Sequence, residues 1–218
     1  MYKPSLLDRM ERKLGRLAVR NLMSVIVGVM ALVFILDYLF AVRINTLFSS
    51  YLIFDREAVL AGEVWRVITF ALLPPNSSVI FIIFSLYFYW MIGSVLETEW
   101  GAFKFNVFYL CGIIGTIAAG FITGYATNYY LNMSLFLAFA LLYPEFELRL
   151  FFAIPVKIKY LAFVDLVLFV IDLITLPWAY KAAIIVSLAN VMLFFGGNLI
   201  SEIKRIKRNR DIKKRFRR

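Results

Sequence analysis

The sequence predicts an all-α integral membrane protein, built as a bundle of six transmembrane helices. Three observations lead to this class. Hydrophobic residues make up 62% of the 218 residues, well above the roughly half that is typical of soluble domains. They gather in continuous runs, several of them near the ~20 residues that a helix needs to cross about 30 Å of hydrocarbon. Basic clusters flank this set of runs at both ends of the chain.

The segment 1–20 is expected to form a cytoplasmic amphipathic helix in the membrane interface. Its apolar residues recur every three or four positions, which places them on one face of a helix. These residues are Leu7, Met10, Leu14 and Leu17. The opposite face carries Arg9, Arg12, Lys13 and Arg16. A basic helix of this kind lies along the membrane surface with its apolar face in the lipid.

The apolar runs form one membrane domain over 21–200. The expected spans are 21–42, 78–96, 103–124, 130–143, 160–176 and 179–200. The fourth is the shortest and ends at Pro144, so we expect it to be the most enclosed. The connection 43–77 mixes charged and apolar residues and is expected to lie in the outer interface, where irregular backbone must be sheltered by protein. The connection after Pro144 is amphipathic.

The distribution of positive charge predicts the topology. The net charge is +10, and six of the 24 Lys and Arg residues lie in the first 20 positions. Ten more follow Asn198, in a basic tail over 201–218. Cations that flank membrane spans mark the cytoplasmic side, and an even number of spans returns the chain to its starting side. We therefore expect both termini in the cytoplasm, in contact with anionic lipids and not with nucleic acid.

The chain contains no histidine and a single cysteine, Cys111. The first fact excludes a serine hydrolase that uses a histidine base. A lone cysteine inside an apolar run forms neither an internal disulfide nor a cysteine-based metal site. No metal and no cofactor are expected.

Four short motifs occur in order between residues 60 and 200. They are Glu63-Val-Trp65-Arg66; Gly93-Ser-Val-Leu96-Glu97 with Gly101, Phe105, Tyr109, Gly112 and Gly115; Leu141-Leu-Tyr-Pro144 with Ile154-Pro-Val-Lys157; and Ala189-Asn190 with Gly197. In this order and spacing they resemble the first loop, the second and third spans, the end of the fourth span and the sixth span of the rhomboid superfamily. The resemblance implies a rhomboid-like bundle with an interfacial first loop.

The resemblance also implies structural roles for these residues. Glu63, Trp65 and Arg66 are expected to anchor the first loop. The residues expected to serve helix packing are Gly93, Glu97, Gly101, Gly112, Gly115 and Gly197. Because small residues let membrane helices approach closely, we expect the glycines to bring the second and third spans together.

Departures from the rhomboid pattern argue against proteolysis. Rhomboid proteases carry a Gly-x-Ser-Gly serine on span four and activate it with a histidine on span six. Here Ser134 lacks the glycines, and the base position is Asn190, whose amide cannot accept a proton near neutral pH. The positions that would help stabilise the oxyanion are Phe81 and Ser85. The resemblance therefore implies an inactive, derlin-like pseudoprotease with Ser134 and Asn190 as degenerate dyad positions.

The expected function is the binding of transmembrane client proteins in membrane protein quality control or trafficking, with local thinning of the bilayer. Asp165 and Asp172 fall within a span, and ionisable groups at that depth usually face a polar interior or a partner; Asp37 lies near the outer end of the first span.

The alternatives are an intramembrane serine protease with an unconventional dyad and a small membrane transporter. No glycine follows Gly197, so the derlin tail motif that recruits a cytosolic ATPase is absent, which favours a bacterial plasma membrane. The oligomeric state is not predicted.

Overall fold

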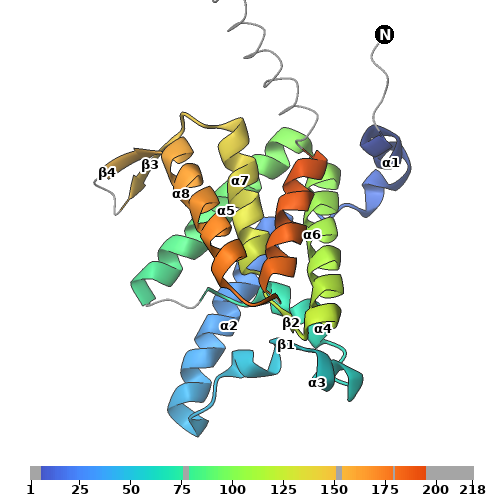
Figure 1. Cartoon of the computed structure of the whole chain (residues 1–218), viewed down its shortest axis with the longest axis vertical. Coiled ribbons are helices and arrows are strands. Elements are labelled where there is room, and N and C mark those ends of the chain that lie inside the picture. The colour runs from blue at the N-terminus through green and yellow to red at the C-terminus, as the bar shows by residue number, and fades with distance from the viewer. Residues whose placement is uncertain (1–5, 76–78, 151–153, 179, 195–218) are drawn as a thin grey trace, which may run out of the picture.

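The computed structural model describes residues 6–75, 79–150, 154–178 and 180–194, and this part of the chain is mostly helical (Figure 1). A short amphipathic helix, α1 (Leu6–Leu14), continues into the 3-10 helix η1 (Gly15–Leu17). Within the described residues, three helices are long and apolar enough to cross a membrane. They are α2 (Leu22–Ile44), α5 (Val79–Trp100) and α6 (Ala102–Thr123). This architecture is compatible with an all-α integral membrane protein.

Three shorter apolar helices complete the bundle. They are α7 (Tyr129–Leu142), α8 (Ile158–Thr175) and a final helix over Tyr180–Phe194. Each lies where a hydrophobic run predicted a helix, although residues 195–200 of the last run fall outside the described residues. Helix α1 and the end of the Tyr180–Phe194 helix lie at one end of the bundle, whereas the connection between α2 and α5 lies at the other (Figure 1).

That connection is an ordered assembly of short elements. It contains η2 (Phe48–Tyr51), β1 (Phe54–Asp55), α3 (Arg56–Leu60), α4 (Arg66–Thr69) and η3 (Phe70–Leu72). Strand β1 pairs antiparallel with β2 (Tyr125–Ala126), the segment between α6 and α7. The sequence did not predict this pairing, which satisfies backbone groups of the connection and attaches it to the bundle.

A second two-stranded sheet follows α7. Strands β3 (Glu147–Leu150) and β4 (Ile154–Lys157) form an antiparallel hairpin. At its base, the Glu145 carboxylate accepts hydrogen bonds from Lys157 Nζ at 2.8 Å and from Lys159 Nζ at 2.5 Å. These lysines hold the pKa of Glu145 down, at about 2. The amphipathic connection predicted after Pro144 is this hairpin.

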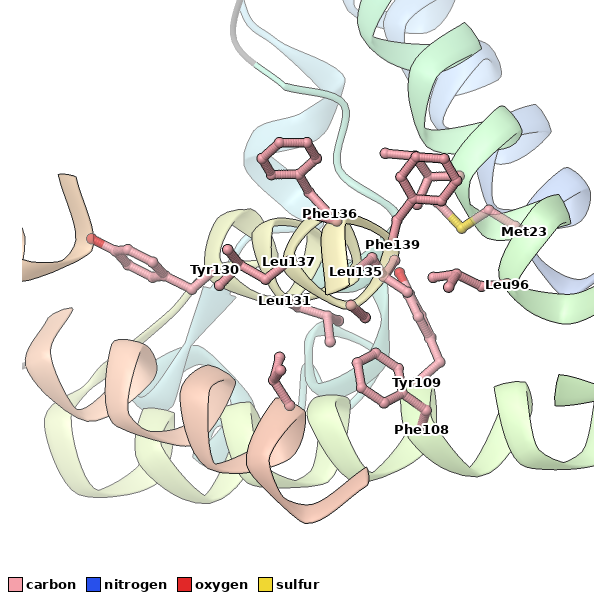
Figure 2. Packing of buried hydrophobic residues seen from close by; sticks show 14 of the residues in the cluster. Met23, Leu96, Phe108, Tyr109, Tyr130, Leu131, Leu135, Phe136, Leu137 and Phe139 are labelled. Atoms are coloured by element: carbon pink, nitrogen blue, oxygen red, sulfur yellow. The ribbon is translucent and has the colours of Figure 1, made fainter. Parts of the chain in front are cut away.

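Helix α7 lies at the centre of the molecule. It has 14 residues, fewer than α2, α5, α6 and α8, and ten of them are buried. Figure 2 shows its side chains among residues of α2, α5 and α6, including Met23, Leu96 and Phe108. The described structure therefore agrees with the expectation that the fourth apolar run is short and enclosed.

Three of the predicted helix-packing glycines closely approach other helices. A Cβ on Gly93 of α5 would lie 2.5 Å from Met23 Cβ of α2, and one on Gly115 of α6 would lie 2.5 Å from Val186 in the Tyr180–Phe194 helix. A Cβ on Gly112 would meet Leu131 of α7. These three glycines therefore lie at close contacts between helices, but their nearest neighbours lie on α2, α7 and the Tyr180–Phe194 helix, while α5 and α6 also contact each other.

Gly101 has a different role, and Gly197 lies outside the described residues. The backbone of Gly101 has φ of 83°, a left-handed conformation that glycine adopts at little cost. It forms the tight turn between the end of α5 and the start of α6. Helix α5 ends at Trp100, so it continues past the predicted boundary at residue 96.

Candidate functional site

The two degenerate dyad positions are both buried and both donate to backbone carbonyls. Ser134 is 0% exposed, and its Oγ donates to the Leu131 carbonyl at 2.6 Å, within α7. Asn190 Nδ2 donates to the Phe108 carbonyl of α6 at 3.1 Å. The Ser134 hydroxyl proton is therefore directed at its own helix, an arrangement suited to helix packing.

The two predicted oxyanion positions lie in the first two turns of α5. Phe81 is 50% exposed and Ser85 is half-buried. Tyr89, one helical turn beyond Ser85, lines a cavity at the N-terminal end of α7.

The residues that were predicted to anchor the first loop, which is the connection between α2 and α5, form a network centred on Arg66. Arg66 is 9% exposed, and its guanidinium pairs with Glu63 through Nε at 2.5 Å. Arg66 Nη1 also donates to the carbonyls of Ser50 at 2.8 Å and Ile53 at 2.9 Å. The planar fork of arginine suits such simultaneous contacts. The network fixes α4 against the segment that follows α2.

Trp65 extends this network. Its indole Nε1 donates to the Tyr51 carbonyl at 3.1 Å, while its side chain is 49% exposed. Thr69 Oγ1 donates to the Leu52 carbonyl at 3.0 Å. A partly exposed indole ring whose N–H is hydrogen-bonded is typical of a membrane interface.

A cavity of about 360 Å³ lies where this connection meets the N-terminal end of α7. It is lined by the first loop, the β2 segment, α2, α5 and α7, and many of its lining side chains are polar. These are Asp37, Ser49, Tyr89, Tyr125, Thr127, Asn128, Tyr129 and Asn132. Pockets of this size are large enough to hold a small ligand or part of a larger one. Burial raises the pKa of the Tyr125 hydroxyl, so this group stays protonated and able to donate.

Several cavity residues have defined hydrogen-bond roles in the fold. Asn128 Nδ2 donates to the carbonyls of Ala71 at 3.2 Å and Leu73 at 2.8 Å, which joins the start of α7 to the first loop. Asp37 Oδ1 accepts the backbone N–H of Ser49 at 2.6 Å. These two residues position the walls of the cavity.

Three buried side-chain oxygens lack a hydrogen-bond partner within the described residues: Tyr109 Oη of α6, Asn132 Oδ1 of α7 and Asp165 Oδ2 of α8. Asn132, 3% exposed, lines the cavity, and its Oδ1 accepts no hydrogen bond within the described part of the chain. The same holds for Oδ2 of Asp165 on α8, which is 5% exposed. Asp165 interacts electrostatically with Tyr89 and Tyr129, both of which line the cavity. A buried polar group without a partner costs about 1–3 kcal/mol, so this cluster is prepared to accept hydrogen bonds.

Asp172 lies farther along α8 and is half-buried. Its Oδ2 accepts a hydrogen bond from the Tyr130 hydroxyl of α7 at 3.3 Å. The sequence singled out both aspartates but not Asn128, Asn132 or Tyr89. An asparagine inside the apolar run YYLNMSLF was the available signal, since amides at membrane depth usually have a specific reason to be there.

The described residues contain no group of three or more Cys, Asp or Glu side chains placed to hold a metal ion. No family model matches the chain, and no curated protein matches it either. The arrangement of the site therefore carries the functional argument.

Proposed function

We propose that this chain is a non-catalytic, rhomboid-like membrane protein that binds transmembrane client helices through the polar cavity at the outer end of α7. The observation that carries the proposal is Asn132 Oδ1, a buried oxygen without a partner on a residue that lines the cavity; Asp165 Oδ2 on α8 is a second such oxygen. A client helix with a polar side chain at the same depth would donate to these oxygens and relieve the cost of leaving them unpaired.

The proposal includes a topology of six spans with both termini in the cytoplasm. Helices α2, α5 and α6 have the required length, and α7, α8 and the Tyr180–Phe194 helix are the remaining spans. The basic N-terminal segment and the basic tail would then lie on the cytoplasmic side. The position of α1 and of the end of the last described helix at one end of the bundle supports this topology (Figure 1).

The length of α7 supports a site within the membrane. Its 14 residues measure ~21 Å at ~1.5 Å per residue, about 9 Å less than the hydrocarbon thickness. If its cytoplasmic end lies at the interface, the cavity at its other end lies below the outer surface. Lipid beside such a short helix would thin locally, at a modest cost.

A role without catalysis follows from the chemistry of Ser134. The hydroxyl donates to Leu131 in its own helix, and the position expected for a base is Asn190. The conventional activation of serine requires a group that takes its proton. A cleavage assay in lipid with model transmembrane substrates tests this point directly. We expect no product; product that disappears in Ser134→Ala would show a protease with an unconventional dyad.

Client binding is tested with model transmembrane peptides of defined sequence. One peptide carries glutamine in its outer third, and the matched peptide carries leucine there. A photoreactive amino acid replaces Tyr129, which lines the cavity and is 46% exposed. The control position is Phe163 of α8, which is 68% exposed and does not line the cavity.

The expected result is selective crosslinking of the glutamine peptide from position 129. Each relieved oxygen corresponds to roughly a fivefold or greater preference, given that a buried unpaired group costs about 1–3 kcal/mol. Equal crosslinking of the two peptides at position 129, or equal yields at 129 and 163, would overturn the proposal.

A further inference from the structure

A second, apolar groove lies beside the start of α2 and has a volume of about 540 Å³. It is bounded by α1 and η1, the start of α2, the first half of α6, and the segment around α4 and η3. Met10 and Leu14 line it at the α1 end, Val107 and Leu110 along α6, and Ala71 and Ile113 at the far end. We call this the α1–α6 groove. Its lining is almost wholly apolar, so water is a poor occupant.

The wall formed by α1 is held in place by specific polar contacts. Lys104 of α6 pairs with Asp8 at 2.7 Å and with Glu11 at 3.7 Å. Just after η1, Val19 exchanges two hydrogen bonds with the Asn106 side chain: its N–H donates to Oδ1 at 3.1 Å, and its carbonyl accepts from Nδ2 at 2.8 Å. The groove is therefore a built feature of the fold.

The same contacts leave a cationic rim at one end of the groove. Because the acidic residues Asp8 and Glu11 both turn toward Lys104, the cations of this segment dominate its outer surface. The exposed cations are Arg9, Arg12, Lys13, Arg16 and Arg20. Figure 1 places α1 beside the end of α6 at which the groove begins. The rim is complementary to an anionic headgroup.

The length of the groove matches one leaflet. It follows α6 from Phe103 to Ile113, a distance of ~15 Å at ~1.5 Å per residue. Half of the ~30 Å hydrocarbon core is also ~15 Å. An acyl chain that starts at the α1 rim would therefore reach the end of the groove at the bilayer midplane.

We propose that the α1–α6 groove binds an acyl chain of an anionic phospholipid, whose headgroup lies against the cations of α1. The site would hold α1 on the membrane surface through a bound lipid as well as through its own apolar face. The inference rests on the proposed placement of α1 at the membrane surface and is independent of client binding, because the two sites have different linings.

The test uses lipid probes and the unmodified chain in bilayers. Phosphatidylglycerol with a photoreactive diazirine on its acyl chain is compared with the same probe built on phosphatidylcholine. Adducts are mapped by mass spectrometry to residues 103–113 of α6 and, as a reference for bulk lipid, to the exposed face of α8 around Val164, which is 54% exposed. We expect roughly fivefold more phosphatidylglycerol adduct at 103–113, the preference that one Lys or Arg near an anionic surface supplies, and no preference at Val164.

Two variants separate the groove from general attraction to charge. Replacing Arg9, Arg12, Lys13 and Arg16 by Gln should abolish the preference, whereas replacing four tail cations by Gln (Lys204, Arg205, Lys207 and Arg208) should preserve it. Val107→Trp should lower the adduct yield within the groove, and Val164→Trp should not.

Three results would overturn the proposal. The first is an equal yield from the two probes at 103–113. The second is a preference that survives loss of the α1 cations. The third is crosslinking of residues 103–113 to a second copy of the chain in place of lipid, which would make the groove an interface between copies.

Discussion

The carboxylate of Glu97 caps the N-terminus of α2 through the backbone of Asn21. Glu97 Oε1 accepts the N–H of Asn21 at 2.6 Å, and Oε2 accepts that of Leu22 at 3.1 Å. Asn21 adopts the left-handed conformation and provides no side-chain cap of its own. The start of the first long helix thus depends on a residue near the end of α5, which supplies both the acceptor and a negative charge where the helix dipole favours one.

Glu97→Gln should destabilise the protein by about 1 kcal/mol. The amide keeps the shape of the side chain but loses the charge that strengthens both hydrogen bonds. Thermal or denaturant unfolding in detergent micelles measures the change. Glu57→Gln is the matched control, because Glu57 is exposed in α3. Equal stability of the two variants would contradict the capping role.

Arg66→Lys should destabilise the first loop by about 2 kcal/mol, because lysine cannot reproduce the forked contacts with Glu63, Ser50 and Ile53. The expected readout is faster proteolysis within residues 48–72, together with a lower unfolding temperature. Arg56→Lys is the control, since Arg56 is less tightly bound, with one contact of 3.4 Å to the Phe121 carbonyl. If both variants resist protease equally well, the anchoring role of Arg66 is wrong.

Hydrophobic run length predicted the positions of the long helices because the membrane fixes how many apolar residues a helix needs. The same rule misplaced the end of α5. Glu97 ends an apolar run, which predicted the end of the helix there. In the structure the Glu97 carboxylate accepts a hydrogen bond from the α2 backbone, and α5 continues to Trp100. The β1–β2 pairing and the β3–β4 hairpin were not predicted, since strands of two to four residues carry too little pattern.

The candidate site was predicted only in part. Glu63 and Arg66 were predicted to belong to one set of anchoring residues, and the structure pairs these two side chains. Asn132 was missed, because the sequence shows a polar residue in an apolar run without showing whether another element satisfies it. The neighbours of the individual glycines could not be predicted for a related reason: a small residue predicts a close approach but does not identify the helix that approaches.

Gly93→Ala should destabilise the protein by about 1–3 kcal/mol, because its new methyl group would overlap Met23 and push α2 away from α5. Gly28→Ala is the opposite case within α2. No heavy atom outside its own helix turn lies within 4 Å of the added Cβ, so alanine should be neutral or stabilising by up to ~1 kcal/mol. Denaturant unfolding of both variants in the same micelles measures the difference. Similar losses at the two positions would show that the α2–α5 contact is not tight at Gly93.

The base of the β3–β4 hairpin should be sensitive to acid. The pKa of Glu145 falls from 4.5 to about 2 through its hydrogen bonds with Lys157 and Lys159. A lowered folded-state pKa adds stability that is fully present above pH 4.5 and is lost as the pH falls through about 2. Glu145→Gln should therefore be less stable than the unmodified protein at neutral pH, and the difference should close near pH 2. Amide exchange in residues 144–150 and 155–159 follows the hairpin directly; a difference independent of pH would exclude the ion pairs as its cause.

The two asparagines of the cavity should respond in opposite ways to replacement by leucine. Asn128 donates to Ala71 and Leu73, so Asn128→Leu leaves both carbonyls without a donor and should destabilise the fold by about 1–3 kcal/mol. Asn132 Oδ1 has no partner among the described residues, and an apolar side chain of similar shape removes that cost, so Asn132→Leu should be neutral or stabilising.

The same Asn132→Leu protein should lose its preference for the transmembrane peptide that carries glutamine, since the acceptor oxygen in the cavity is gone. A variant that is at least as stable as the original yet binds the client less well separates a functional role from a structural one. Unfolding and peptide crosslinking from position 129, measured on one preparation, provide both readouts. A stable Asn132→Leu protein that still prefers the glutamine peptide would leave Asp165 as the acceptor, and Asp165→Leu would then have to abolish the preference for the client proposal to stand.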